Sequence, residues 1–136
     1  MKIYHFLSVT LALCLSVTLA RAQQPQTPEQ REKQLLEYVD KEVQRLSTLL
    51  ELEYWQEFYV DSTLTHDYKA MNEEMEKMQG AKVENSDLYI NVQDKWMQQI
   101  DDTYKRLFTA DQWAKYWKNG GKRAQDARDK RNKKKK

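Results

Sequence analysis

The stretch GAKVENSD, residues 80–87, is the clearest turn signal in the chain. Gly80 ends one apolar pattern, and Asn85 or Ser86 is placed to cap the helix that follows. On both sides of this turn, apolar residues recur every three or four positions, which is the period of one helix face. They are Val60, Leu64, Tyr68, Met71, Met75 and Met78 before the turn, and Val92, Trp96, Ile100, Tyr104 and Leu107 after it. The sequence therefore predicts an antiparallel hairpin of two long helices.

Another helix is predicted before the hairpin. Thr27, Pro28 and Gln30 have the pattern of a capping box with proline at the first helical position. An apolar stripe follows, formed by Leu36, Val39, Val43, Leu46 and Leu50. Because about 25 residues is long for an uncapped globular helix, we expect a bend or helix boundary within residues 50–63. No segment alternates β-branched and polar residues as a strand would, so the predicted fold class is all-α.

A second capping pattern opens a shorter helix in the stretch FTADQW, residues 108–113. Thr109 is placed as the N-cap, and Gln112, three residues later, can hydrogen-bond back to it. Phe108 before the cap and Trp113 at the fourth helical position can pack together as a hydrophobic staple. We therefore expect a short, capped C-terminal helix. Since so short a helix is not stable alone, its large aromatic side chains must dock on the rest of the protein.

The first 22 residues have the pattern of an export signal. An apolar run is followed by a small-residue A-x-A cleavage sequence at residues 20–22. Polar residues interrupt the run, which is shorter than the ~20 consecutive apolar residues of a stable membrane span. The single cysteine, Cys14, would leave with the signal. We therefore expect an exported, periplasmic protein in which residues 23–121 form one helical domain without disulfides.

Charge divides the remainder into an acidic body and a basic tail. Residues 23–121 hold 12 Lys and Arg against 19 Asp and Glu, whereas residues 122–136 hold 9 against 2. The tail has no apolar face to bury, which predicts disorder or a frayed helix. Three roles of the tail are expected as alternatives. It binds an anionic membrane surface, it docks on an acidic body of this chain or of a partner, or it only solubilises the protein. Export argues against nucleic acid. The residues assigned to anionic-surface contact are Lys133, Lys134, Lys135 and Lys136.

Two five-residue stretches carry a family resemblance. FTADQ, residues 108–112, matches an LTxxQ pattern with Phe in place of Leu, and LEYWQ, residues 52–56, keeps Leu52 and Gln56 but has Glu53 in place of Thr. The chain thus resembles the LTxxQ motif family of exported helical proteins, the Spy/CpxP-like proteins. The resemblance implies a small helical cradle, assembled as a homodimer, that holds non-native proteins without ATP or reports envelope stress to a partner protein. It also implies basic and apolar side chains on the cradle, whereas this body is acidic.

Thirteen aromatic residues lie beyond residue 22, including all four tryptophans of the chain. As a group they are best interpreted as large core side chains. Exposed, they would suit binding of unfolded chains, because apolar surface is what non-native proteins bind. The candidates for client or partner contact are Trp55, Phe58, Tyr116 and Trp117.

No cofactor, metal or catalytic site is predicted. Met71, Met75 and Met78 share one helix face but are interpreted as gap fillers, since no histidine or cysteine joins them. His66 lacks a second ligand at metal-binding spacing. No phosphate-binding loop or nucleophile elbow can be written with so few glycines, so an enzyme is not expected. The sequence favours ATP-independent binding of non-native proteins or a role in envelope stress response. The alternatives are a structural adaptor on an anionic envelope surface and a metal-sensing relative.

Overall fold

The computed structural model describes residues 27–134. The chain divides into two units, Met1–Glu32 and Lys33–Lys136, each of which is described by itself. The predicted signal peptide, residues 1–22, lies outside the described residues, as do Lys135 and Lys136. Of the first unit, only residues 27–32 are described, and they begin the first helix.

That helix, α2 (Pro28–Leu50), starts with the predicted capping box. Thr27 Oγ1 accepts a hydrogen bond from the Gln30 backbone N–H at 3.2 Å, and the Thr27 N–H donates to Gln30 Oε1 at 3.0 Å. Two backbone donors that the helix itself cannot pair are thereby satisfied. The boundary predicted at Thr27 is confirmed.

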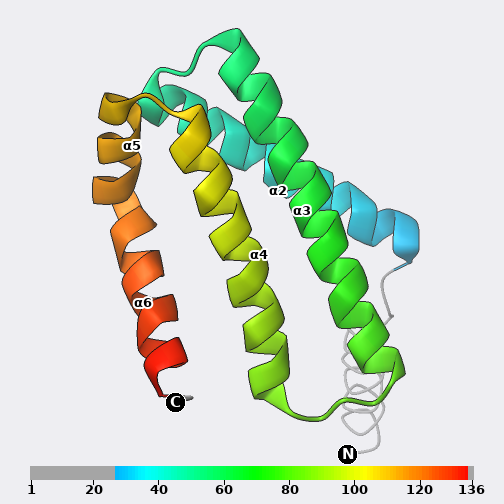
Figure 1. Cartoon of the computed structure of the whole chain (residues 1–136). Coiled ribbons are helices and arrows are strands. Elements are labelled where there is room, and N and C mark those ends of the chain that lie inside the picture. The colour runs from blue at the N-terminus through cyan, green and yellow to red at the C-terminus, as the bar shows by residue number, and fades with distance from the viewer. Residues whose placement is uncertain (1–26, 135–136) are drawn as a thin grey trace, which may run out of the picture. The chain divides into compact units, whose positions relative to one another are not determined.

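The described chain is helical apart from short turns, and no strand occurs within residues 27–134. After α2 come α3 (Tyr54–Gly80), α4 (Ser86–Leu107), α5 (Ala110–Tyr116), the π-helical segment η2 (Trp117–Gly121) and α6 (Lys122–Lys133). Figure 1 shows α3 and α4 side by side and antiparallel, with α5 and α6 following one another beside α4. The predicted all-α class and helical hairpin are confirmed.

The turn between α3 and α4 lies where the sequence placed it. Gly80 is the last residue of α3, and Asn85 caps α4, its side chain accepting from the Asp87 backbone N–H at 2.9 Å. The Tyr89 hydroxyl donates to the Val83 carbonyl at 3.0 Å and ties the turn to the first residues of α4. The return direction of the chain is therefore fixed by local hydrogen bonds as well as by packing.

The core joins α2 to the hairpin. Burying one of these side chains contributes on the order of 1.5–3 kcal/mol, so this cluster is the main stabilising contact among the helices. Leu36 departs from the predicted stripe, because it is exposed. The buried apolar cluster consists of Val39, Leu46 and Leu50 from α2, Val60, Leu64 and Tyr68 from α3, and Ile100, Tyr104 and Phe108 at the end of α4.

The helix boundary expected within residues 50–63 lies at residues 51–53. Glu51 adopts the left-handed conformation with φ of 53°, and the Leu52 N–H donates to the Ser47 carbonyl at 3.2 Å. This pattern closes the end of α2 in the way a glycine usually does. The residue after it, Glu53, is the N-cap of α3. The chain thus turns from α2 into α3 within three residues, and Leu52 is half-buried against the core.

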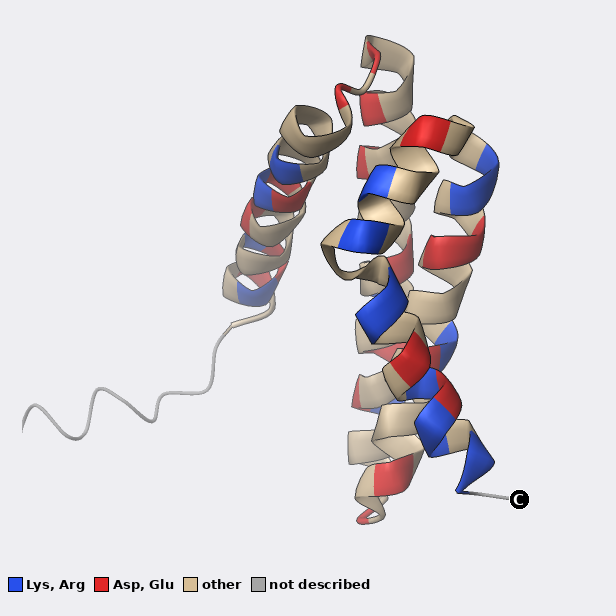
Figure 2. Ribbon diagram, turned by 90° about the vertical axis from the view of Figure 1, so that its left-hand side faces the viewer, with Lys and Arg blue, Asp and Glu red and all other residues tan. Residues whose placement is uncertain are grey.

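The structure corrects the prediction of a disordered tail, because residues 122–133 form α6. Lys and Arg dominate this helix, with Asp residues among them (Figure 2). It belongs to the same unit as the hairpin. Its anchor is polar rather than apolar, since Arg128 and Arg131 pair with Asp101 and Asp94 of α4. A search for an apolar face therefore could not detect it.

Two glycines let the chain bend from α5 into α6. Gly120 has φ of 129°, which side-chain-bearing residues rarely adopt. At Gly121 a Cβ would lie 2.8 Å from Tyr116 Cε1, so the ring of Tyr116 occupies the space of a side chain. The Asn119 side chain donates to the Lys115 carbonyl at 2.8 Å and holds the end of α5. The kink therefore depends on backbone freedom at one glycine and on close packing at the other.

Candidate functional site

The two stretches that resemble LTxxQ motifs meet in space. Gln56 Nε2 donates to Gln112 Oε1 at 2.8 Å, and Gln112 Nε2 donates to Gln56 Oε1 at 3.0 Å. Gln56 is 2% exposed. Two amides that each donate to and accept from the other therefore join the start of α3 to the start of α5.

Each glutamine also closes the capping box of its own helix. The Glu53 N–H donates to Gln56 Oε1 at 3.0 Å, and the Thr109 N–H donates to Gln112 Oε1 at 3.0 Å. Gln56 Nε2 makes a further bond to the Leu107 carbonyl at 3.2 Å, at the end of α4. The buried Gln56 amide is thus fully satisfied, which is the condition for a polar group to stabilise a core.

The aromatic residues of α5 dock on the hairpin. Tyr116 packs edge-on against Tyr104, with ring centroids 5.5 Å apart, and its hydroxyl donates to Asp101. Trp117 stacks on Trp113 at 5.4 Å. Phe108 is buried, and Trp113 packs against the same core cluster. Of the predicted contact residues, Tyr116 and Trp117 therefore lie within this packed cluster and are half-buried.

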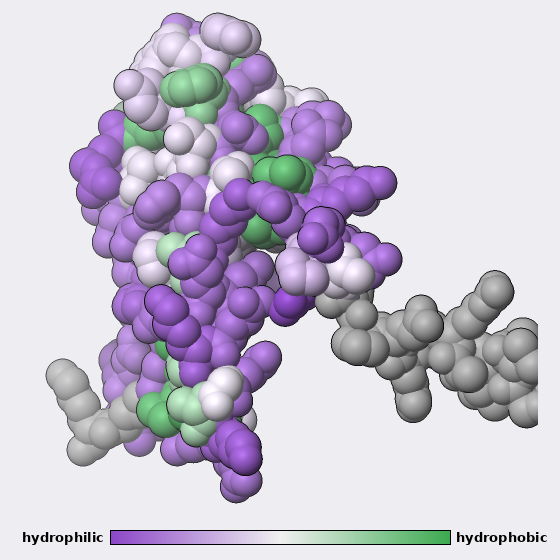
Figure 3. Space-filling view, turned by 90° about the vertical axis from the view of Figure 1, so that its right-hand side faces the viewer, coloured by the Kyte–Doolittle hydropathy of each residue, from purple (hydrophilic) through white to green (hydrophobic). Residues whose placement is uncertain are grey.

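The other two predicted contact residues lie on an open surface. Trp55 and Phe58 belong to the first two turns of α3, together with Tyr54 and Tyr59, which the sequence analysis did not single out. Their exposed fractions are 86% for Tyr54, 49% for Trp55, 63% for Phe58 and 55% for Tyr59. We call these four residues the aromatic face. In Figure 3, pale and green side chains gather at the end of the molecule where α3 begins.

The aromatic face follows from the position of these residues on the helix. Gln56, Val60 and Leu64 are buried, and they mark the inner side of α3. Positions 54, 55, 58 and 59 fall on the opposite side at 100° per residue. The spacing of these four residues therefore indicates that they are exposed. This can be inferred only after the buried side of α3 has been identified.

Three rings of the aromatic face, those of Trp55, Phe58 and Tyr59, also contact one another. Trp55 and Tyr59 meet edge-on with centroids 6.3 Å apart, and Phe58 and Tyr59 meet edge-on at 5.8 Å. Trp55 Nε1 donates to Glu53 Oε2 at 2.6 Å, which fixes the indole to the helix cap. Because these three rings are already held, a ligand would order few of their side chains on binding.

Two arginines anchor the basic helix. Arg128 and Asp101 are 4% and 3% exposed and form an ion pair, and Asp101 also accepts from Tyr116. Arg131 binds both oxygens of Asp94, at 2.8 and 2.5 Å. The bond to Asp94 raises the pKa of Arg131, while burial and then the bond to Asp101 raise the pKa of Tyr116. These two ion pairs dock α6 on the acidic body of the same chain, which is one of the predicted roles of the tail.

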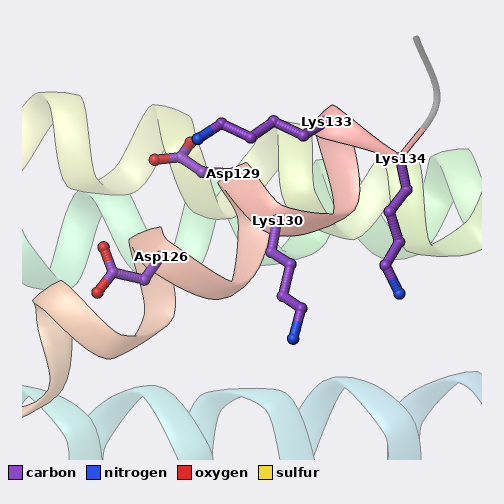
Figure 4. Close-up of a pocket in the computed structure, with 5 residues that line it drawn as sticks. All are labelled: Asp126, Asp129, Lys130, Lys133 and Lys134. Atoms are coloured by element: carbon purple, nitrogen blue, oxygen red, sulfur yellow. The ribbon is translucent and has the colours of Figure 1, made fainter.

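Three lysines at the end of α6, namely Lys130, Lys133 and Lys134, line a pocket together with Asp126 and Asp129. Figure 4 shows Lys130 and Lys134 pointing to the same side of α6, whereas Asp129 and Lys133 point to the opposite side. Lys133 and Lys134 are exposed, as a surface contact requires. The other two lysines assigned to surface contact lie outside the described residues.

The remaining candidate residues have ordinary structural partners. His66 Nδ1 lies 2.8 Å from Asp67 Oδ1, and Asp67 also accepts from Gln99 at 3.0 Å. Met71 packs against the core cluster. Within residues 27–134, no group of three or more His, Cys, Asp or Glu side chains is arranged to hold a metal ion. No helix in that range combines the length and apolar character needed to cross a membrane.

No protein-family model, curated protein sequence or solved structure matches this chain. The functional interpretation therefore rests on the surfaces of the molecule, foremost the aromatic face and the basic side of α6.

Proposed function

We propose that this protein is exported to the periplasm and binds non-native segments of other proteins without ATP or cofactor. The observation that carries the proposal is the aromatic face, where four large rings lie together in water. An aromatic side chain buries 150–250 Å² when covered, so four half-exposed rings offer roughly 400 Å². The largest apolar patch on a typical monomer is of about this size and is often functional.

The strength of such a site would suit a reversible binder. At about 25 cal/mol per Å², covering roughly 400 Å² gives at most about 10 kcal/mol. Loss of translational, rotational and side-chain freedom offsets much of this gain. Unfolded segments would therefore bind and dissociate, as a holding function requires.

The paired capping boxes support the same proposal through the resemblance to LTxxQ proteins. Gln56 and Gln112 each close a box and bond to each other, so the two motif-like stretches form one structural unit. Reporting of envelope stress to a partner protein, the other role implied by that resemblance, would use the same surface.

An aggregation assay with a reduced, aggregation-prone model protein tests the proposal. The native protein should suppress light scattering at a few-fold excess, and Trp55→Ser/Phe58→Ser should lose most of that effect. Both side chains are exposed, so the variant keeps its core. Leu88→Ser is the matched control, because Leu88 is an exposed apolar residue at the other end of the hairpin. Equal suppression by all three proteins, or none by the native one, would refute the proposal.

A second candidate function is attachment to an anionic envelope surface. It is favoured by Lys130 and Lys134, which point to one side of α6 (Figure 4). Each lysine held close to an anionic membrane surface gains about 1 kcal/mol of binding free energy. Binding to vesicles containing phosphatidylglycerol should weaken in Lys130→Gln/Lys134→Gln but not in Lys41→Gln/Lys105→Gln, which removes the same charge from α2 and α4. Equal binding of both variants would exclude this role for α6.

A further inference from the structure

We infer that the aromatic face selects cationic segments, namely unfolded stretches in which Arg or Lys accompanies apolar side chains. This inference rests on the proposed function and adds the chemical class of the bound segment. It follows from the charges that surround the four rings.

Those charges are of one sign. Between Arg45 and Lys69 the chain has no Lys or Arg, but it has five Asp and Glu. Glu53 and Asp61 are exposed on α3, one at each end of the aromatic face. Glu57 is half-buried and accepts from Ser47. The α3 macrodipole adds roughly +0.5 charge at this end, which is too little to offset three carboxylates.

The neighbouring elements carry bases near the start of α3, namely Lys115 on α5 and, in the last turn of α4, Lys105 and Arg106. Lys115 of α5 lies 3.4 Å from Glu51 and balances that carboxylate. Arg45 of α2 is bound to Glu42 at 2.8 Å and is engaged on its own helix. The exposed charges that α3 and its N-cap place beside the four rings are nevertheless negative, and they belong to Glu53 and Asp61.

Rings and carboxylates together favour one kind of ligand. A cation over the face of Trp or Tyr is attracted by the ring quadrupole, and Arg stacks on such faces particularly well. Glu53 Oε2 accepts from the Trp55 indole at 2.6 Å, so a carboxylate lies directly beside that ring. An Arg side chain stacked on Trp55 would therefore meet both attractions at once, while adjacent apolar residues of the segment would cover Phe58.

Three matched disordered peptides test the inference against the native protein. All alternate Leu with Gly and carry Arg, Gln or Glu at the same remaining positions, and binding is followed by fluorescence anisotropy. The Arg peptide should bind about tenfold more tightly than the Glu peptide at low salt. This preference should shrink as NaCl rises from about 50 to 500 mM, because screening weakens exposed charges.

Charge variants locate the effect. Glu53→Gln keeps an acceptor oxygen for the helix cap, and Asp61→Asn removes an exposed charge. Together these two substitutions should lower the affinity for the Arg peptide by roughly fivefold and leave the affinity for the Gln peptide unchanged. The control variant Glu73→Gln/Glu84→Gln removes the same amount of charge near the far end of the hairpin. It should change neither of the two peptide affinities.

The outcomes separate the two proposals. Equal affinity for all three peptides overturns the selection for cations but leaves the aromatic site standing. Binding of none of them overturns both. If sedimentation shows that a second copy of the chain occupies the face, so that peptides bind only after dimer dissociation, the inference also fails.

Discussion

Gln56 and Gln112 lie 56 residues apart in the chain and hydrogen-bond to each other through both amide groups. Each also completes the capping box of its own helix. Local structure and tertiary contact thus depend on the same two side chains. This junction holds the start of α3, and with it the aromatic face, against the start of α5.

Removing one partner of this junction should cost more than removing a cap. Gln112→Ala leaves the buried Gln56 amide short of two bonds, and a buried unsatisfied polar group costs about 1–3 kcal/mol. Urea unfolding should therefore show a loss of about 2 kcal/mol in the free energy of unfolding. The control is Gln30→Ala, which opens an exposed capping box that has no partner box and should cost ~1 kcal/mol or less.

A double-mutant cycle makes the coupling explicit. The double variant Gln56→Ala/Gln112→Ala should be less destabilised than the sum of the two single variants, by about 0.5 kcal/mol or more. Directly bonded residues typically show a coupling of about 0.5–3 kcal/mol. Strict additivity would show that the two boxes act independently.

The buried Tyr104 and the half-buried Tyr116 should respond differently to loss of the hydroxyl group. The Tyr104 hydroxyl is buried and has no hydrogen-bond partner among the described residues, whereas the Tyr116 hydroxyl donates to Asp101. Tyr104→Phe should leave the protein as stable or up to ~1 kcal/mol more stable, and Tyr116→Phe should destabilise it by about 1.5–3 kcal/mol. Thermal and urea unfolding of both variants check this, and a loss of stability in Tyr104→Phe would indicate a partner for its hydroxyl.

The basic helix should detach when its buried arginine is removed. Arg128→Ala leaves Asp101 as a buried carboxylate without its cation. Breaking a buried ion pair in this way costs about 3–5 kcal/mol of stability. Amide hydrogen exchange along α6 should rise strongly in this variant. Arg123→Ala, at an exposed position on the same helix, is the control and should keep the native exchange pattern. Unchanged protection in Arg128→Ala would show that α6 is held by other contacts.

Alkaline pH should destabilise the fold through its tyrosines. Burial raises the pKa values of Tyr68, Tyr104 and Tyr116 above the ordinary value of 10.0. The folded state therefore keeps protons that the unfolded state releases, so stability is fully present below pH ~10 and falls as pH rises beyond it. Tyrosinate absorbance should reveal a group that titrates later in the native protein than in urea. Superimposable titration curves for the two states would contradict this.

Much of the helical framework could be predicted from the sequence because it is encoded locally. The turn after Gly80, the Asn85 cap and the Thr27 and Thr109 capping boxes each depend on a few adjacent residues. The hairpin itself follows from two apolar stripes of matching period. The helix boundary after Leu50 could be placed only within a range, since Glu51 takes a conformation usually reserved for glycine.

What the sequence left hidden depends on distant partners. Neither glutamine of the junction indicates that the other lies opposite it, and α6 is ordered by Arg128 and Arg131 reaching carboxylates on α4. Polar anchors of this kind leave no apolar periodicity to detect. Tyr54 and Tyr59 were missed for the complementary reason, because aromatic residues usually signal a core and these face water.

The central claim, that the aromatic face binds non-native protein, is tested most directly by site-specific photocrosslinking. A photoreactive phenylalanine analogue placed at Phe58, and in a second protein at Leu88, would be exposed to light with a reduced, carboxymethylated model protein that cannot refold. The account predicts cross-links from position 58 and none above background from position 88. Equal cross-linking from both positions, or none from position 58, would contradict it.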